Sequence, residues 1–329
     1  MTDFQTIPKT ELHLHLEGAA PPAFIRQLAH EKKVDLAGIF GADGNYKWTD
    51  FVHFLRVYET ACSVLQTPED FARLTEAVLA ESSKHGVIYT EIFLAPDFCG
   101  GDLVKWREYL AAIVEAAQRS EAKFGITTRF ISTVVRHFGA ENARKTARMS
   151  AETVGPMLTG FGMGGDESFG AAGDFKWAFQ CAAEAGLGLT SHAGEVRGAD
   201  SVIETIRDLK VTRIGHGVRS VEDAELIRQI VDMGVHLEVN PGSNISLSVF
   251  PKLADHSIQN LRDAGVSVSV STDDPPYFDT DMTREYQGLA STFGWGEADF
   301  SAINRDAMEA AFCDAETRQR IKSRFKESA

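Results

Sequence analysis

The chain has 329 residues, of which 33 are Lys or Arg and 47 are Asp or Glu, so its formal net charge is −14. A charge of this sign and a pI of about 5.2 argue against a nucleic-acid-binding protein, which needs a basic surface. Hydrophobic residues make up 43% and charged residues 24% of the chain, as in ordinary globular proteins. We therefore expect a folded protein with a sizeable core.

No segment has the features of a secretion signal or a membrane span. Met1–Pro8 has no apolar core, and no uninterrupted apolar run reaches about 18 residues. We expect a cytoplasmic protein that has no membrane partner. The cysteines are far apart and form no C-x-x-C pair, so we expect buried thiols without a disulfide or a thiolate zinc site. They are Cys62, Cys99, Cys181 and Cys313.

Short β-favouring runs alternate with longer stretches of helical spacing along the chain. The expected strands are Thr10–Leu16, Val87–Phe93, Ile126–Val135, Leu158–Met163, Leu187–His192, Arg213–His216, His236–Val239 and Val266–Ser271. Helical stretches between them include Asp102–Phe124, Asp174–Ala185, Ser220–Met233 and Pro251–Ala264. Open doubly wound sheets more often stop at five or six strands, so this order favours an α/β fold with a single closed (β/α)8 TIM barrel.

The segment between the first two expected strands is too long for one crossover helix. It contains helical stretches near Pro22–Lys33, Asp50–Ser63 and Pro68–His85, with a Gly-rich turn at Gly41–Asn45. In a barrel, such connections cover the C-terminal mouth, where substrates bind. We therefore expect these extra helices to form a lid.

Two histidines lie one residue apart in the first expected strand. Side chains repeat every two residues in a strand, so His13 and His15 would share a face, as two ligands of one metal do. Ten histidines in 329 residues give roughly 0.3 such pairs by chance. The pair alone therefore favours two solvated or hydrogen-bonded histidines.

Further metal-type residues follow later expected strands. They lie in Ser191–Glu195, Gly215–Gly217 and Ser271–Pro275. The C-terminal ends of barrel strands converge, so residues about 260 positions apart become neighbours. Three imidazoles and one carboxylate suit Zn²⁺ and leave a position open for water. Residues 158–167 contain no lysine to bridge a second metal, so we expect one zinc ion per chain. Its expected ligands are His13, His15, His192 and Asp273.

Two more residues are candidates for catalysis beside the metal. Glu195 lies three residues after His192 on a Gly-containing turn, which suits a general acid and base. His216 would have a free imidazole that orients or deprotonates the water. The alternative for His216 is a fifth metal ligand.

The sequence resembles the adenosine deaminase family of the amidohydrolase superfamily in motifs spread over nearly the whole chain. These motifs are Lys9–Gly18, Gly164–Glu167, His192–Glu195, Gly215–Gly217 and Ser271–Pro275. The resemblance implies a single metal-dependent hydrolase domain over residues 1–329, one zinc ion, no organic cofactor, and hydrolytic deamination at C6 of a purine. It further implies that Glu195 protonates ring N1 and that His216 activates the zinc hydroxide.

The resemblance also implies substrate-binding residues. Asp274 would hydrogen-bond N7 and the backbone N–H of Gly165 would meet N3, with His15 and Glu17 also beside the substrate. An apolar helix walls the pocket in this family, and ordinary packing against the barrel is the alternative here. The candidates on that helix are Phe51, Val52 and Leu55.

Three departures from the family pattern bear on the substrate. Glu17 stands where many adenosine deaminases have Asp, a position that contacts ribose hydroxyls, and Glu is also seen there in adenine deaminases. Gly162–Gly164 replaces a commoner Asp-Leu-Ala, and Asn240 stands where the family often has Cys. In contrast, Gly165–Glu167 resembles the nucleoside enzymes.

We therefore expect deamination of adenosine or 2′-deoxyadenosine, with a small purine nucleoside as partner and no nucleic acid. One alternative is a deaminase of adenine or another 6-aminopurine. Another is a catalytically inactive family member that acts as a binding protein, which we would expect to have lost a ligand or the acid. The candidate ligands and the acid are all present. The sequence does not indicate an oligomeric state.

The remaining histidines have no partner at an informative spacing, and we expect most of them at the surface or in caps. They are His30, His53, His85, His137, His236 and His256. His137 is the exception, since it follows the third expected strand near the mouth.

Overall fold

The computed structural model describes residues 3–325, in which eight parallel strands form one sheet in chain order. The strands are β1 (Lys9–His15), β2 (Val87–Leu94), β3 (Thr127–Val135), β4 (Leu158–Gly164), β5 (Gly188–Ala193), β6 (Arg213–His216), β7 (His236–Val239) and β8 (Val268–Val270). The residues just after β8 bring the sheet back to β1. The Asp273 N–H donates to the His13 carbonyl at 3.1 Å, and the His15 N–H donates to the Asp273 carbonyl at 3.1 Å. The predicted TIM barrel is therefore confirmed.

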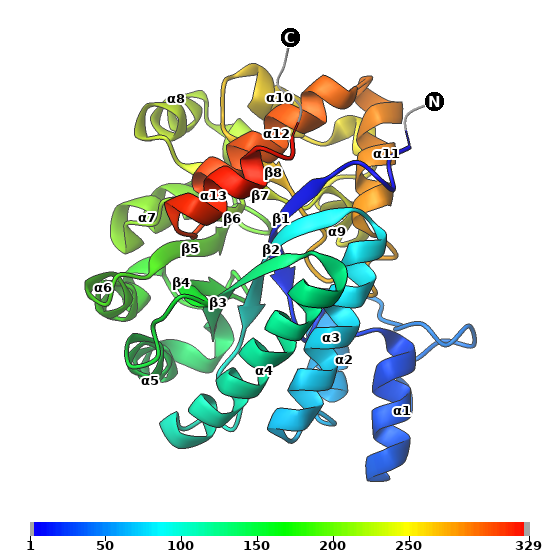
Figure 1. Ribbon diagram of the computed structural model, residues 1–329. Coiled ribbons are helices and arrows are strands. Elements are labelled where there is room, and N and C mark those ends of the chain that lie inside the picture. The colour runs from blue at the N-terminus through cyan, green and yellow to red at the C-terminus, as the bar shows by residue number, and fades with distance from the viewer. Residues whose placement is uncertain (1–2, 326–329) are drawn as a thin grey trace.

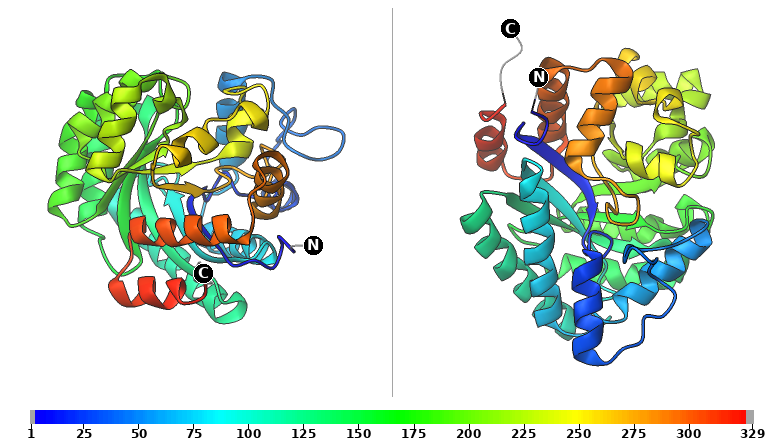
Figure 2. Two further views of the ribbon diagram at one scale, coloured as in Figure 1. Left: turned by 90° about the horizontal axis from the view of Figure 1, so that it is seen from above. Right: turned by 90° about the vertical axis from the view of Figure 1, so that its right-hand side faces the viewer.

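Within residues 3–325 the strands are surrounded by thirteen α-helices (Figure 1). These are α1 (Pro22–Lys32), α2 (Phe51–Cys62), α3 (Pro68–Lys84), α4 (Leu103–Phe124), α5 (Gly139–Ala151), α6 (Lys176–Glu184), α7 (Ala199–Leu209), α8 (Ala224–Met233), α9 (Pro241–Ser246), α10 (Ile258–Asp263), α11 (Met282–Phe293), α12 (Glu297–Ala310) and α13 (Ala315–Lys322). Strand β1 runs from the end of the barrel near both chain ends toward the end that carries α1 (Figures 1 and 2). The C-terminal ends of the strands therefore face the extra helices of the first connection.

Local sequence signals explain where several helices begin and end. Thr67 and Asp70 form a capping box before α3, and Asp223 caps α8 with its side chain. That cap makes α8 begin at Ala224, four residues after the predicted start. Gly125 adopts the left-handed conformation that ends α4, a conformation that costs glycine little.

One predicted helix, Pro251–Ala264, is wrong in its first half. Leu253–Asp255 form a short 3₁₀ helix, and α10 covers only Ile258–Asp263. The backbone of His256 is extended, and its ring Nδ1 accepts the Ile258 N–H at 3.1 Å. Apolar spacing cannot reveal such a break, because it comes from a side chain that binds the backbone.

The long first connection is tied to the loop after β8. The rings of Tyr46 and Tyr277 stack with centroids 3.9 Å apart, and Trp48 Nε1 donates to the Tyr277 carbonyl at 3.0 Å. The predicted turn at Gly41–Asn45 closes through a bond from the Gly41 N–H to the Asn45 carbonyl at 2.8 Å. These contacts hold the segment before α2 against the barrel.

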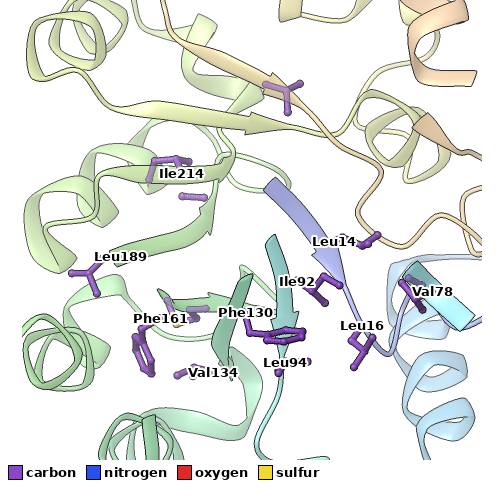
Figure 3. Close-up of a cluster of buried hydrophobic side chains, with 14 of the residues drawn as sticks. Leu14, Leu16, Val78, Ile92, Leu94, Phe130, Val134, Phe161, Leu189 and Ile214 are labelled. Carbon is purple, nitrogen blue, oxygen red and sulfur yellow. The ribbon is translucent and has the colours of Figure 1, made fainter. Parts of the chain in front are cut away.

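The main hydrophobic core lies between the strands and the surrounding helices. Leu14, Ile92 and Phe130 are buried in this layer, as Figure 3 shows. Since neighbouring strand residues alternate in direction, burial of Leu14 in this outer layer turns His13 and His15 toward the barrel interior. The core thus determines which face of β1 carries the histidines.

The cysteines are expected to be buried thiols, and no helix is expected to span a membrane. All four cysteines are free, and Cys62 and Cys99 are buried as predicted. Cys181 and Cys313 are only half-buried, because they pack at the edges of the core. Among residues 3–325, no helix is both long enough and apolar enough to cross a membrane.

Candidate active site

The strand ends bring seven metal-type side chains into one buried cluster. Within overlapping groups of three, their ring nitrogens and carboxylate oxygens lie within 4.8 Å of one another. The residues are His13, His15, His192, Glu195, His216, Asp273 and Asp274. The sequence predicts that these residues meet, and the structure confirms that they do.

The donor set fits a single divalent metal. His13 and His192 each direct a buried Nε2 that has no hydrogen-bond partner in the described protein. The other ring nitrogen of His13, Nδ1, donates to Glu238 Oε2 at 2.6 Å. A carboxylate on the far nitrogen is typical of histidines that bind zinc, because it fixes the ring and makes it a better ligand. Burial opposes a second proton on His13, but Asp273 and Glu238 raise its pKa to about 9. Metal binding would therefore displace a proton from His13 Nε2.

Asp273 supplies the carboxylate of this donor set from a strained backbone position. Its φ is +66°, which is uncommon for a residue other than glycine. Oδ1 lies 3.4 Å from His13 Nε2 and 3.3 Å from His15 Nε2, and Oδ2 accepts a bond from Ser243 Oγ at 2.7 Å. Although burial opposes ionisation, the close contacts with the imidazoles of His13 and His15 hold the pKa of Asp273 well below its usual range. An ionised carboxylate is the form that binds a metal.

Glu195 lies beside the donor set with its side chain almost completely buried. Burial, followed by the nearby charges of Asp273 and Glu167, raises the pKa of Glu195 well above its usual range. A carboxyl group that stays protonated near neutral pH can deliver a proton. This environment matches the predicted general acid.

Glu167 holds the loop that carries Glu195, a contribution that the sequence analysis missed. Its carboxylate accepts bonds from four consecutive backbone N–H groups and one hydroxyl at 2.6 to 3.1 Å. The donors are Gly194, Glu195, Val196, Arg197 and Ser201 Oγ. Glu167 belongs to a motif that the sequence analysis quoted, but nothing in that motif indicates which loop it binds.

Asp274 approaches the backbone of Gly18 so closely that no side chain fits there. A Cβ atom on Gly18 would lie 1.5 Å from Asp274 Oδ1. That oxygen has no hydrogen-bond partner in the described protein. Burial, with the charges of Asp273 and Glu195, raises the pKa of Asp274 well above its usual range. Asp274 therefore lines the cavity with a carboxyl group that has one unsatisfied, buried oxygen.

A cavity of about 80 Å³ opens beside the cluster. Phe51 and Leu55 of α2 line it as predicted, and Gly165 and His137 line it too. Val52 was also predicted to line it, and that prediction is wrong. Its side chain is 62% exposed. A helix has 3.6 residues per turn, so the face of Phe51 and Leu55 continues through two residues that were not predicted. They are Phe54 and Tyr58.

Glu17 lines the same cavity and is 3% exposed. One carboxylate oxygen accepts the Ala95 N–H at 3.4 Å, and Tyr58 hydrogen-bonds the side chain. Burial raises the pKa of Glu17 to about 7, despite the hydrogen bonds that lower it. Near neutral pH this carboxyl group can therefore donate or accept a hydrogen bond.

His216 is fully buried at the end of β6, and its φ is +66°. Nε2 lies 3.6 Å from Glu195 Oε2 and 3.9 Å from Asp273 Oδ2, whereas Nδ1 faces two asparagine side chains. Burial lowers the pKa of His216 to about 3.

Two other histidines depart from the prediction of surface or capping positions. His236 and His256 are buried, because each ring lies among core elements and binds a neighbouring polar group.

Comparisons with known proteins agree with this geometry. Residues 8–328 match the family model described as adenosine deaminase. An adenine deaminase of Rhizobium johnstonii is 45% identical over 319 residues, which cover 97% of this chain and 99% of that protein. An adenine deaminase of Agrobacterium fabrum is also 45% identical, over 96% of this chain and 97% of its own length. The crystal structure of an adenine deaminase from Arthrobacter aurescens superposes with a TM-score of 0.89 at 29% identity, covering 97% of this chain and 98% of that one.

Proposed function

The chain belongs to the adenosine deaminase family, and from this premise we propose that it hydrolyses adenine to hypoxanthine and ammonia. Relatives that are 45% identical over nearly the whole chain are adenine deaminases. They support the adenine alternative of the sequence analysis better than its main expectation, adenosine or 2′-deoxyadenosine. Their names also speak against an inactive binding protein.

We propose that one zinc ion per chain is held by His13, His15, His192 and Asp273. Bound zinc lowers the pKa of a coordinated water to about 7, which makes water a nucleophile at neutral pH. The orphaned nitrogens of His13 and His192, together with the ionised carboxylate of Asp273, support this assignment. The protein's part is to hold these donors in a dry, shaped site.

Glu195 supplies the proton that the ring needs. As the water oxygen adds to C6, the protonated carboxyl group of Glu195 gives its proton to N1, so that negative charge does not build up on the ring. The water provides two protons in all. One restores Glu195 and the other leaves with the amine as ammonia, which balances the reaction. The raised pKa of Glu195 supports this role.

Two further residues would orient the purine. Asp274 lines the cavity, and its raised pKa favours the protonated carboxyl group, which would donate a hydrogen bond to N7. The Gly165 backbone lies at the cavity wall, where its N–H would meet N3. Together with Glu195, these contacts would hold both edges of the base and leave C6 beside the cluster.

The observation that carries the choice of adenine is the position of Glu17. Its carboxyl group is buried at the cavity and is hydrogen-bonded by Tyr58 and by the Ala95 N–H. It stands at the position that contacts ribose hydroxyls in many adenosine deaminases. Adenosine remains the second candidate, because Gly165–Glu167 resembles the nucleoside enzymes.

A substrate panel tests the proposal. Adenine, adenosine and 2′-deoxyadenosine are assayed side by side by ultraviolet absorbance, and adenine should have the highest kcat/KM. Faster turnover of adenosine would reject the choice of adenine and leave the deamination chemistry in place. Absence of turnover for all three compounds by zinc-loaded protein would reject the proposed function.

A further inference from the structure

Behind His216, a series of hydrogen bonds leads from the cluster of metal-type side chains to the backbone of α10. Its far end is the Ile258 N–H, which donates to His256 Nδ1 at 3.1 Å. A backbone N–H can only donate, so His256 Nδ1 must be an unprotonated acceptor. The donor and the acceptor at this end of the hydrogen-bond series are therefore fixed by the backbone and do not depend on how any side-chain amide is oriented.

The next hydrogen bond in this series determines how the side-chain amide of Asn244 is oriented. Because Nδ1 of His256 carries no proton, the neutral ring carries its proton on Nε2. Burial lowers the pKa of His256 to about 3, which favours the neutral ring. Nε2 lies 3.1 Å from Asn244 Oδ1, so it donates to that oxygen. The orientation of the Asn244 amide is thereby set, with Nδ2 on the other side.

The last hydrogen bonds of this series reach His216 in the cluster of metal-type side chains. Asn244 Nδ2 lies 3.1 Å from His216 Nδ1, and Asn240 Nδ2 lies 3.4 Å from the same atom. An amide nitrogen can only donate, so His216 Nδ1 accepts, and the proton of the neutral His216 ring is on Nε2. Nε2 has no hydrogen-bond partner in the described protein and lies 3.6 Å from Glu195 Oε2.

We propose that His256 and Asn244 are positioning residues that fix His216 as the Nε2–H tautomer, so that His216 holds the attacking water oxygen by donating a hydrogen bond to it. The sequence left three roles open for His216: to orient the water, to deprotonate it, or to ligate the metal. The last two need a lone pair on Nε2, and this tautomer has none there. His216 then acts as a fixed donor beside the reacting oxygen, and the protons of the water go to carboxylates.

This inference rests on the proposed function only for the identity of the reaction, because the tautomer can be measured directly. Zinc-loaded protein labelled with ¹⁵N in histidine is studied by NMR, and His216 is assigned from a His216→Gln sample. We expect a one-bond N–H coupling at Nε2 of His216 and none at Nδ1. A proton on Nδ1 of the unmodified protein, alone or together with one on Nε2, would overturn the inference even if adenine is the substrate.

The variant Asn244→Asp tests the positioning role. A carboxylate only accepts, so it would draw the proton of His216 to Nδ1 and remove the donor at Nε2. We expect kcat to fall about 100-fold or more, as when one donor to a developing oxyanion is lost, with KM and zinc content little changed. Normal kcat together with a proton on Nδ1 would show that the tautomer does not matter and would overturn the proposal.

Two further variants separate positioning from general loss of structure. Asn244→Ser keeps a hydroxyl donor for His216 and should retain the Nε2–H signal and more of kcat than Asn244→Asp. His236→Gln alters a second buried histidine, whose Nδ1 lies 2.8 Å from Ser267 Oγ and which is not part of the hydrogen-bond series. It should leave both the His216 tautomer and kcat unchanged. Equal losses of kcat in Asn244→Ser and Asn244→Asp, with the tautomer unchanged in both, would assign Asn244 a structural role only.

Discussion

Glu238 Oε2 accepts a hydrogen bond from His13 Nδ1 at 2.6 Å, and both side chains are fully buried. The other oxygen of Glu238 accepts bonds from Arg213 Nε at 2.6 Å and Thr190 Oγ1 at 2.8 Å. Arg213 in turn donates to Glu91 Oε2 at 2.6 Å. A buried network of alternating charges thus anchors one proposed metal ligand to the middle of the barrel.

Breaking this anchor should weaken metal binding more than it changes the fold. In Glu238→Gln, the neutral amide holds His13 less firmly and makes it a poorer ligand, so we expect zinc affinity to fall about 10- to 100-fold. Competition with a chelating dye measures the affinity, and circular dichroism of the zinc-free protein serves as the control for folding. Unchanged affinity in a folded variant would show that Glu238 contributes only to packing.

The purified protein should hold about one zinc ion per chain and lose turnover on chelation, because the attacking water depends on the metal for its acidity. Elemental analysis gives the stoichiometry, and adding back zinc should restore activity. Two metals per chain would contradict the assignment to His13, His15, His192 and Asp273.

Glu195→Gln should keep zinc but lower kcat by about 100- to 10,000-fold, because an amide cannot give a proton to N1. Asp273→Ala should instead lose zinc, since it removes a carboxylate from the donor set. Metal analysis alongside steady-state kinetics separates the two effects. Near-normal turnover of the Gln variant would mean that another group is the acid.

Shortening Glu17 should change the choice between base and nucleoside. We expect Glu17→Ala to raise the ratio of kcat/KM for adenosine over adenine by about tenfold or more, because it opens the side of the cavity that Glu17 fills. The assay compares both substrates on the same preparation. A fall in that ratio would instead mean that Glu17 contacts ribose, as the residue at this position does in many adenosine deaminases.

Acid should destabilise the fold partly through His236. Burial, with the charge of Arg213, lowers the pKa of His236 from about 6.5 to about 3 in the folded chain. Between these two pH values, His236 therefore binds a proton in the unfolded chain but not in the folded chain. His236 therefore does not lower the free energy of unfolding above about pH 6.5. As the pH falls from there toward 3, the free energy of unfolding decreases by up to about 1.4 kcal/mol per pH unit because of this histidine. In urea unfolding of the zinc-free protein, His236→Gln should show a shallower slope of free energy against pH. An identical slope would mean that this histidine does not titrate on unfolding.

The sequence allowed prediction of the strands and of the side chains that form the proposed metal site, but not of the groups that hold them. His13, His192 and Asp273 could be predicted because each lies near or just after the C-terminal end of a strand, and barrel topology brings these ends together. The roles of Glu167 and His256 could not be predicted, because Glu167 binds the loop after β5 and His256 binds Asn244, and only the folded chain brings these groups into contact. For His256, the apolar spacing of the surrounding residues even favoured a continuous helix.

The five hydrogen bonds to Glu167 join the loops after β4 and β5 into one rigid piece. Gly165 lies on the first loop and Glu195 on the second, so the groups proposed to meet N3 and N1 are held at a fixed separation. An insertion or deletion in either loop would shift both contacts at once. During divergence, these two loops should therefore keep their lengths together, while the connection between β1 and β2 is free to vary in length and to alter which purine enters.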